Sequence, residues 1–192
     1  MKTPILLIVS FIMVFSALSQ AQKSKSFISL HHNSPVTSAD YQYGVFLDSL
    51  REPSFWELSK DSTSYLYRFI WLPAFDAPIC IRIEIDRNNN GKLVVKREIK
   101  HDAYYGGIAF DSLVILNSKQ VDDINKMFDN IFFWSSTNIT AKIQIDGSHW
   151  ILEGVRGGKY ISIVKASPEA GPFKDLCIKL VNISGVKLRR VY

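Results

Sequence analysis

The side chains best able to do chemistry in this chain are charged and aromatic residues that interrupt apolar, strand-like segments. Arg68 is the only charge within residues 65–72, and Glu153 is the only acid within residues 149–155. If the strands align, one face of the sheet gathers a charged set with an aromatic rim. The members of this set are Arg68, Arg82, Glu84, His149, Glu153, Tyr104, Tyr105 and Trp150.

Such a set has three interpretations. Opposite charges on a partly covered sheet face form a structural ion-pair network, which is the interpretation we favour. An accessible surface of charges and aromatic rings would instead bind a ligand or a partner. If burial shifted the pKa of Glu153 or His149, this pair would serve as general acid and base in a small hydrolase-like enzyme. The sequence leaves these alternatives open.

Other patterns that are typical of enzymes or of metal sites are incomplete. No G-x-S-x-G motif occurs, and the adjacent His31 and His32 lack metal-ligand spacing. Residues 86–91 begin like a calcium loop, but Arg97 stands where the anchoring carboxylate belongs. We therefore assign no catalytic residue, and we expect neither a metal nor a cofactor.

The first 21 residues have the pattern of a cleavable secretory signal. Lys2 supplies a positive start, residues 5–18 are apolar except for two serines, and small residues stand at Ser19 and Ala21. The apolar run is shorter than the roughly 20 residues of a spanning helix. We expect cleavage after Ala21, no stable membrane span afterwards, and a secreted or periplasmic location.

Length and charge are those of one ordinary domain. The 192 residues divide into a signal peptide (1–21), a polar leader or arm (22–40) and a single α+β domain (41–192). The net charge of +5 is spread along the chain, and no nucleic-acid-binding motif accompanies it. The expected partner is an unknown envelope or extracellular protein or ligand, and not a nucleic acid.

Hydrophobic periodicity predicts an α+β fold. Strands are expected over 65–72, 79–86, 92–100, 105–110, 139–145, 149–155 and 159–165. Helices are expected over 53–58, 118–132 and 173–184. Hairpin-length connections favour a single antiparallel sheet of about six strands, with the two main helices packed on its isoleucine-rich face. The strand at 65–72 is apolar on both faces, so we expect it to lie centrally and to be covered on both sides.

The two cysteines test this arrangement. Cys80 alternates with the isoleucines of its strand, whereas Cys177 lies on the apolar stripe of its helix. If that helix packs on the isoleucine face, the two sulfur atoms point to opposite sides of the sheet. This phasing argues against a disulfide, although an oxidising compartment would permit one.

Two stretches resemble a family of uncharacterised exported bacterial proteins. One is the sequence YRFIWL at 67–72 followed by Pro78 and Ile79, and the other runs from WILEG at 150–154 to SPE at 167–169. The resemblance covers most of residues 64–184 and implies export from a bacterium, but no activity or site. The leading hypothesis is therefore a non-enzymatic binding or interaction module that acts in the periplasm or outside the cell.

Overall fold

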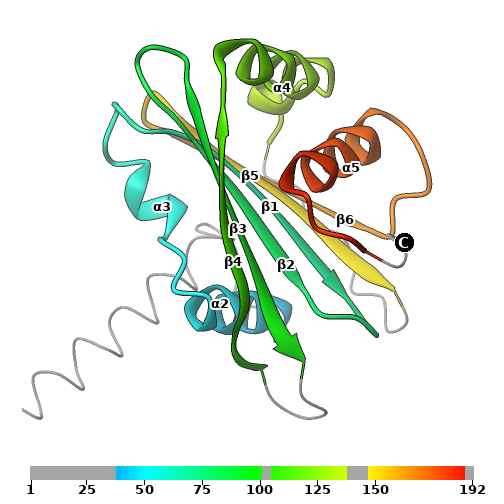
Figure 1. Cartoon of the computed structure of the whole chain (residues 1–192). Helices are drawn as coiled ribbons and strands as arrows, with labels where there is room; N and C mark the ends of the chain where they lie inside the picture. Colours follow the sequence, from blue (N-terminus) through cyan, green and yellow to red (C-terminus); the bar gives the residue numbers. More distant parts are fainter. Residues whose placement is uncertain (1–37, 101–104, 138–146, 189–192) are drawn as a thin grey trace, which may run out of the picture.

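The computed structural model describes residues 38–100, 105–137 and 147–188, which form one mixed α+β unit (Figure 1). Four α-helices and a short 3-10 helix accompany six strands there. In chain order the elements are α2 (Ser38–Ser49), α3 (Phe55–Leu58), β1 (Tyr65–Pro73), β2 (Ile79–Ile85), β3 (Gly91–Lys100), β4 (Tyr105–Leu116), α4 (Ser118–Asn130), η1 (Phe133–Ser135), β5 (Ser148–Arg156), β6 (Lys159–Ala166) and α5 (Pro172–Ser184).

All six strands belong to one antiparallel sheet in the order β4-β3-β2-β1-β5-β6. The predicted antiparallel sheet of about six strands is therefore confirmed, and so is the central position of β1. β4 is longer than its predicted range of 105–110, and the strand predicted over 139–145 lies outside the described residues.

The isoleucine face of the sheet carries the larger apolar core, to which both α4 and α5 contribute (Figure 1). β2 contributes three of its four alternate isoleucines, and β1 contributes Tyr67, Phe69 and Trp71, all at most 1% exposed. The ring of Phe128 from α4 stacks on Tyr67 with a centroid distance of 3.7 Å. Strand alternation thus determines which side chains α4 and α5 bury.

Helices also cover the second face, which the prediction of two main helices on the isoleucine-rich face did not include. Apolar residues of α2 pack on Ile70 and Cys80, while Phe55 of α3 packs on Val155. Residues 43, 46, 47 and 50 of the α2 segment are all buried, and their spacing is that of one helical face. This helical spacing was visible in the sequence. The helix that it forms is the reason why β1 is covered on both faces.

Gly154 allows an unusually close contact between β5 and η1. A Cβ atom at this position would lie 2.5 Å from Cε1 of Phe133, which is far shorter than any normal contact. The glycine of the W-x-LEG stretch therefore has a packing role, because any side chain would push the aromatic cluster at η1 away from the sheet.

The two cysteines lie on opposite faces, as their phasing predicted. Cys80 belongs to the cluster beneath α2, and Cys177 to the cluster beneath α4 and α5; both are buried and free. Burial raises the pKa of both thiols well above its usual range. Within the described residues no helix is long and apolar enough to cross a membrane.

Candidate functional site

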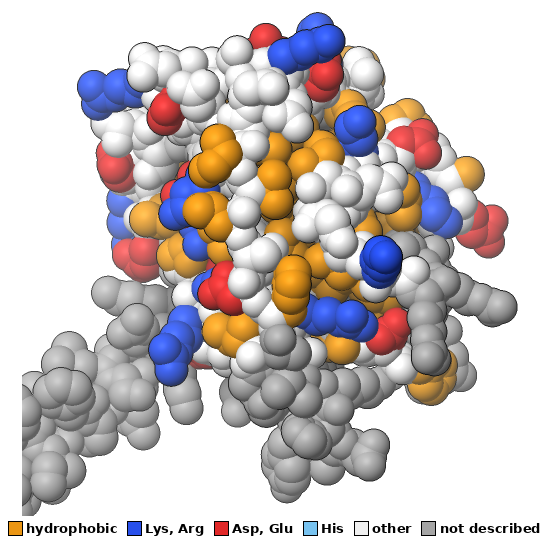
Figure 2. Space-filling model, viewed as in Figure 1, with side chains coloured by type: hydrophobic (Ala, Val, Ile, Leu, Met, Phe, Trp, Pro, Cys, Tyr) orange, Lys and Arg blue, Asp and Glu red, His pale blue; other side chains and the backbone are white. Residues whose placement is uncertain are grey.

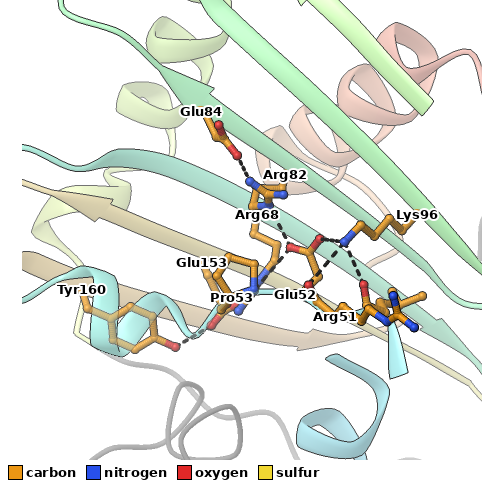
Figure 3. A network of polar contacts seen from close by, with 10 residues as sticks. Arg51, Glu52, Pro53, Arg68, Arg82, Glu84, Lys96, Glu153 and Tyr160 are labelled. Carbon is orange, nitrogen blue, oxygen red and sulfur yellow. Dashed lines mark hydrogen bonds and ion pairs between the residues drawn. The ribbon is translucent and has the colours of Figure 1, made fainter. Parts of the chain in front are cut away.

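The strands align as the hypothesis of a charged face required. Arg68 on β1 stands opposite Arg82 on β2 and opposite Glu153 on β5. Glu84 lies two residues beyond Arg82 and so points to the same face. These four side chains lie on the face that α2 and α3 cover, and Figure 3 shows them side by side.

Arg68 and Glu153 form an ion pair at the centre of this face, and neither side chain has any exposed surface. Nε of Arg68 donates a hydrogen bond to Oε2 of Glu153 at 2.6 Å, and Nη2 lies 2.6 Å from the same oxygen. The hydroxyl of Tyr160 donates to Oε1 of Glu153 at 2.6 Å. Both oxygens of this carboxylate therefore have protein partners, and neither is open to a ligand.

A residue that the sequence analysis missed, Glu52, completes the network. It lies in the connection between α2 and α3 and is 5% exposed. Its Oε2 accepts a hydrogen bond from Nε of Arg82 at 2.9 Å, and its Oε1 lies 3.0 Å from Nζ of Lys96. Nη1 of Arg68 is 3.7 Å from Oε2. One carboxylate thus faces cations from three strands (Figure 3).

Backbone carbonyl groups of the same connection add two further acceptors. Nζ of Lys96 donates to the carbonyl oxygen of Leu50 at 2.8 Å, and Nη1 of Arg68 donates to that of Pro53 at 2.8 Å. The guanidinium of Arg68 also lies 4.1 Å from the ring centroid of Phe55 at the start of α3. The charged set therefore fastens the α2–α3 segment to the sheet.

The electrostatics of the network agree with this role. Burial by itself would raise the pKa of Glu52, but the neighbouring Arg68 and Arg82 outweigh it, so this pKa lies below its usual value. Burial would lower the pKa of Arg68, and the adjacent Glu153 carboxylate outweighs that effect. Burial and the same carboxylate raise the pKa of Tyr160 well above its usual range. All of these groups thus keep the ionisation state that the pairing needs.

The remaining predicted site residues do not join this network. His149 lies beside Tyr43 of α2, with ring centroids 6.0 Å apart, and burial lowers its pKa. Trp150 points to the opposite face and is fully buried in the larger core. Tyr104 lies outside the described residues, and for Tyr105 the structure describes the backbone of β4 only.

A charge count could have pointed to Glu52. Arg68, Arg82 and Lys96 share one face of three adjacent strands, and Glu84 and Glu153 are the acids on the same face of β2 and β5. Glu98 of β3 is a third acid on this face, but it contacts Ser49 and not these cations, and buried charges need partners, so a further negative charge must come from outside the strands. Which acid supplies it depends on how α2 and α3 cross the sheet, and the sequence pattern does not contain that information.

The exposed edge of the sheet differs strongly from this buried network. Leu113 and Ile115 of β4 are 55% and 69% exposed, and among the described strands β4 pairs with β3 only. Figure 2 shows hydrophobic side chains along the strip where Figure 1 draws β4, between α4 and the lower end of the sheet. Three of the six large hydrophobic side chains that are exposed among the described residues thus lie on this outer strand, namely Phe110, Leu113 and Ile115.

Comparisons with known proteins add no relative. No model of a known protein family and no curated protein sequence matches this chain. Among the described residues, no group of three or more His, Cys, Asp or Glu side chains is placed to hold a metal ion. The function must therefore be argued from the geometry itself.

Proposed function

We propose that this protein is an exported, non-enzymatic interaction module that binds an extended segment of another polypeptide along the free edge of β4. The observation that carries the proposal is the exposure of Leu113 and Ile115 on an outer strand. Outer strands offer a row of backbone N–H and C=O groups to which a further strand can add. The two apolar side chains would give such an added strand its specificity.

The two outer strands of the sheet differ in the charges that they carry, and this difference favours β4 as the binding edge. β6 ends the sheet on the other side, and it carries exposed lysines at 159 and 165. Lysine on an outer strand discourages the addition of another chain. β4 has no Lys, Arg or Pro over residues 105–116, although it is the longer strand. β4 does carry one exposed charge, Asp111, against two on β6, so the less protected edge is the better candidate for a contact surface.

The alternative of a hydrolase-like Glu and His pair has less support. Glu153 and His149 stand four residues apart on β5, a separation of about 13 Å along a strand. Arg68 and Tyr160 occupy the carboxylate of Glu153. A general acid and base acting on one substrate must both come within about 3 Å of its reacting groups. The second function therefore lacks the geometry that it needs.

Site-specific photocrosslinking in living cells tests the proposal. A photoreactive side chain at Ile115 should crosslink to a polypeptide, whereas the same group at Lys165 on β6 should not. Both positions are exposed and lie on outer strands, so the comparison isolates the β4 edge. Equal crosslinking from both positions, or none from Ile115, would contradict the proposal.

Lysine substitution provides the matching loss of binding. Leu113→Lys and Ile115→Lys should each reduce capture of the crosslinked partner roughly tenfold or more, because a solvated charge opposes strand addition. The thermal midpoint should hardly change, because both side chains are exposed. Phe132→Lys is the control, since Phe132 is 74% exposed and lies away from β4. If the captured partner is a second copy of this chain, the β4 edge mediates self-association and not binding to a different protein.

A further inference from the structure

A pocket opens where β3 and β4 lie beside the segment that follows α5. Its volume is about 360 Å³, which is within the range of small-molecule sites. The lining residues that matter here are Ala77, Arg97, Phe110, Val186 and Lys187. This pocket is separate from Leu113 and Ile115, because alternation turns those two side chains to the other face of the sheet.

Arg97 has hydrogen-bonding capacity that the described part of the chain does not use. It stands opposite Phe110 across the β3–β4 ladder, and its Nη2 donates to Oδ1 of Asp76 at 3.1 Å. Its Nε is buried and has no hydrogen-bond partner among the residues that the structure describes. A guanidinium offers five N–H donors, and a buried donor without an acceptor is costly. An additional acceptor beside Arg97 would therefore be stabilising.

The charge around the pocket is positive. Lys187 is exposed and adds a second cation to Arg97, while Asp76 supplies a single carboxylate next to them. Glu98 also lines the pocket, but Oε1 of its side chain accepts a hydrogen bond from the hydroxyl of Ser49 on the α2 side at 2.9 Å. The local balance favours an anionic ligand, because two cations face one carboxylate.

One wall of the pocket is apolar. Phe110 is 43% exposed, which is unusual for a large aromatic side chain, and Ala77 and Val186 also line the cavity. An apolar surface beside two cations matches a ligand with an apolar body and one anionic end. A carboxylate is the anion that best fits the planar fork of arginine.

From this arrangement we infer a binding site for small organic monocarboxylates, with the carboxylate paired to Arg97 and Lys187 and the apolar body against Phe110. The site goes beyond the proposed strand addition and does not depend on it, since it uses other residues on the other face of the sheet. It assigns a ligand class to a protein whose charged network is closed to ligands.

Calorimetric titration with 3-phenylpropionate and with octanoate tests the inference on the purified protein. Saturable binding of either acid supports the inference. The acid that binds more tightly shows whether the apolar wall prefers an aromatic or an aliphatic body. The neutral 3-phenylpropionamide should bind roughly tenfold more weakly or not at all, because it cannot pair with the two cations. Equal binding of acid and amide, or no binding of either acid at millimolar concentration, would overturn the inference.

Four substitutions locate the site. Arg97→Gln and Lys187→Gln should weaken acid binding, by roughly tenfold and threefold respectively. Asp76→Asn should strengthen it, because the change removes the competing carboxylate from Arg97. Lys92→Gln is the charge-matched control, since Lys92 is an exposed cation paired with Glu84 on the other face of the sheet.

The substitutions are expected to change the affinity for the acid in opposite directions, so the test stays decisive even if one variant fails to fold. If Arg97→Gln does not fold, Lys187→Gln and Asp76→Asn still report on the site, because Lys187 is exposed and Asp76 lies in a surface turn. Weakening by Lys92→Gln equal to that by Lys187→Gln would show a nonspecific charge effect. That result, or weaker binding by Asp76→Asn, would contradict the assigned site.

Discussion

On one face of the sheet α4 and α5 bury side chains that are almost all apolar, whereas on the other face the α2–α3 segment covers apolar side chains and a network of charges. Arg68, Lys96 and Glu153 are each at most 8% exposed. Apolar packing is non-directional and tolerates many shapes. Buried charges instead require particular partners at particular positions, so they specify where the covering segment must lie.

This difference explains why a charged set on a sheet face need not mark an active site. The cations come from β1, β2 and β3. Glu84 and Glu153 of the sheet accept from two of them, and Glu52 and two backbone carbonyls of the connection between α2 and α3 supply the other acceptors. The charged side chains of this face are engaged in contacts within the protein, and these contacts hold the α2–α3 segment against the sheet. Groups that could bind a partner or a ligand lie elsewhere, in the exposed apolar side chains of β4 and in the buried Nε of Arg97.

The largest effect is expected from breaking the central ion pair. Arg68→Met should lower the free energy of unfolding by about 3–5 kcal/mol, because it leaves the buried carboxylate of Glu153 without its cation. Urea denaturation measures the loss. Hydrogen exchange should show faster opening in α2–α3 than in α4, because only the former is fastened through Arg68.

The double variant Arg68→Met with Glu153→Met distinguishes charge from shape. It should be more stable than Arg68→Met alone, since no unpaired charge remains. A double variant that loses at least as much stability as the single variant would show that packing, and not pairing, holds this face together.

A smaller effect is expected from pH, through Glu98 on the α2 face. Burial raises the pKa of Glu98 to about 7, against an ordinary 4.5, and among the described residues only Ser49 donates to its carboxylate. An acid whose folded pKa is raised stabilises the fold below the unfolded pKa and loses that contribution as pH rises. The free energy of unfolding should therefore receive a falling contribution between pH 4.5 and about 7.

Glu98→Gln should remove that contribution. Comparing denaturation curves of the two proteins at pH 5 and pH 8 isolates it, because the amide keeps a similar shape and cannot ionise. Parallel pH profiles for the wild type and the variant would contradict the assignment.

The smallest effect is expected at the rim of the network. Glu84 pairs with Arg82 and Lys92, but the side chains of Glu84 and Lys92 are 35% and 48% exposed. Glu84→Gln should change the free energy of unfolding by at most about 1 kcal/mol, because water screens exposed pairs. Thermal denaturation checks this value, and a loss as large as that of Arg68→Met would remove the distinction between rim and centre.

Local patterns predicted most of the architecture. Alternation gave five of the six strands within a residue or two of their bounds, and helical spacing gave α4 and α5. Predicting β1 as a strand covered on both faces was also correct, although the helix that covers its second face was not predicted. The four buried positions of the α2 segment, 43, 46, 47 and 50, contained that helix as a pattern.

The candidate site was only partly predictable. The alignment of Arg68, Arg82, Glu84 and Glu153 on one face follows from strand phase and hairpin register. Their closure by Glu52 does not follow, because that residue lies outside the strands. His149 shares their face but lies too far along β5 to join them, and Trp150 shows that adjacent residues of a strand serve opposite faces.

The sequence by itself determined the class of fold, the central strand and the opposite faces of the two cysteines, because these depend on periodicity within single segments. Only the tertiary structure decided whether the charged face is open or closed. That outcome depends on contacts between Glu52 and strands that lie 16 to 44 residues away along the chain. Such contacts are set by how helices cross a sheet, and no local pattern encodes the crossing.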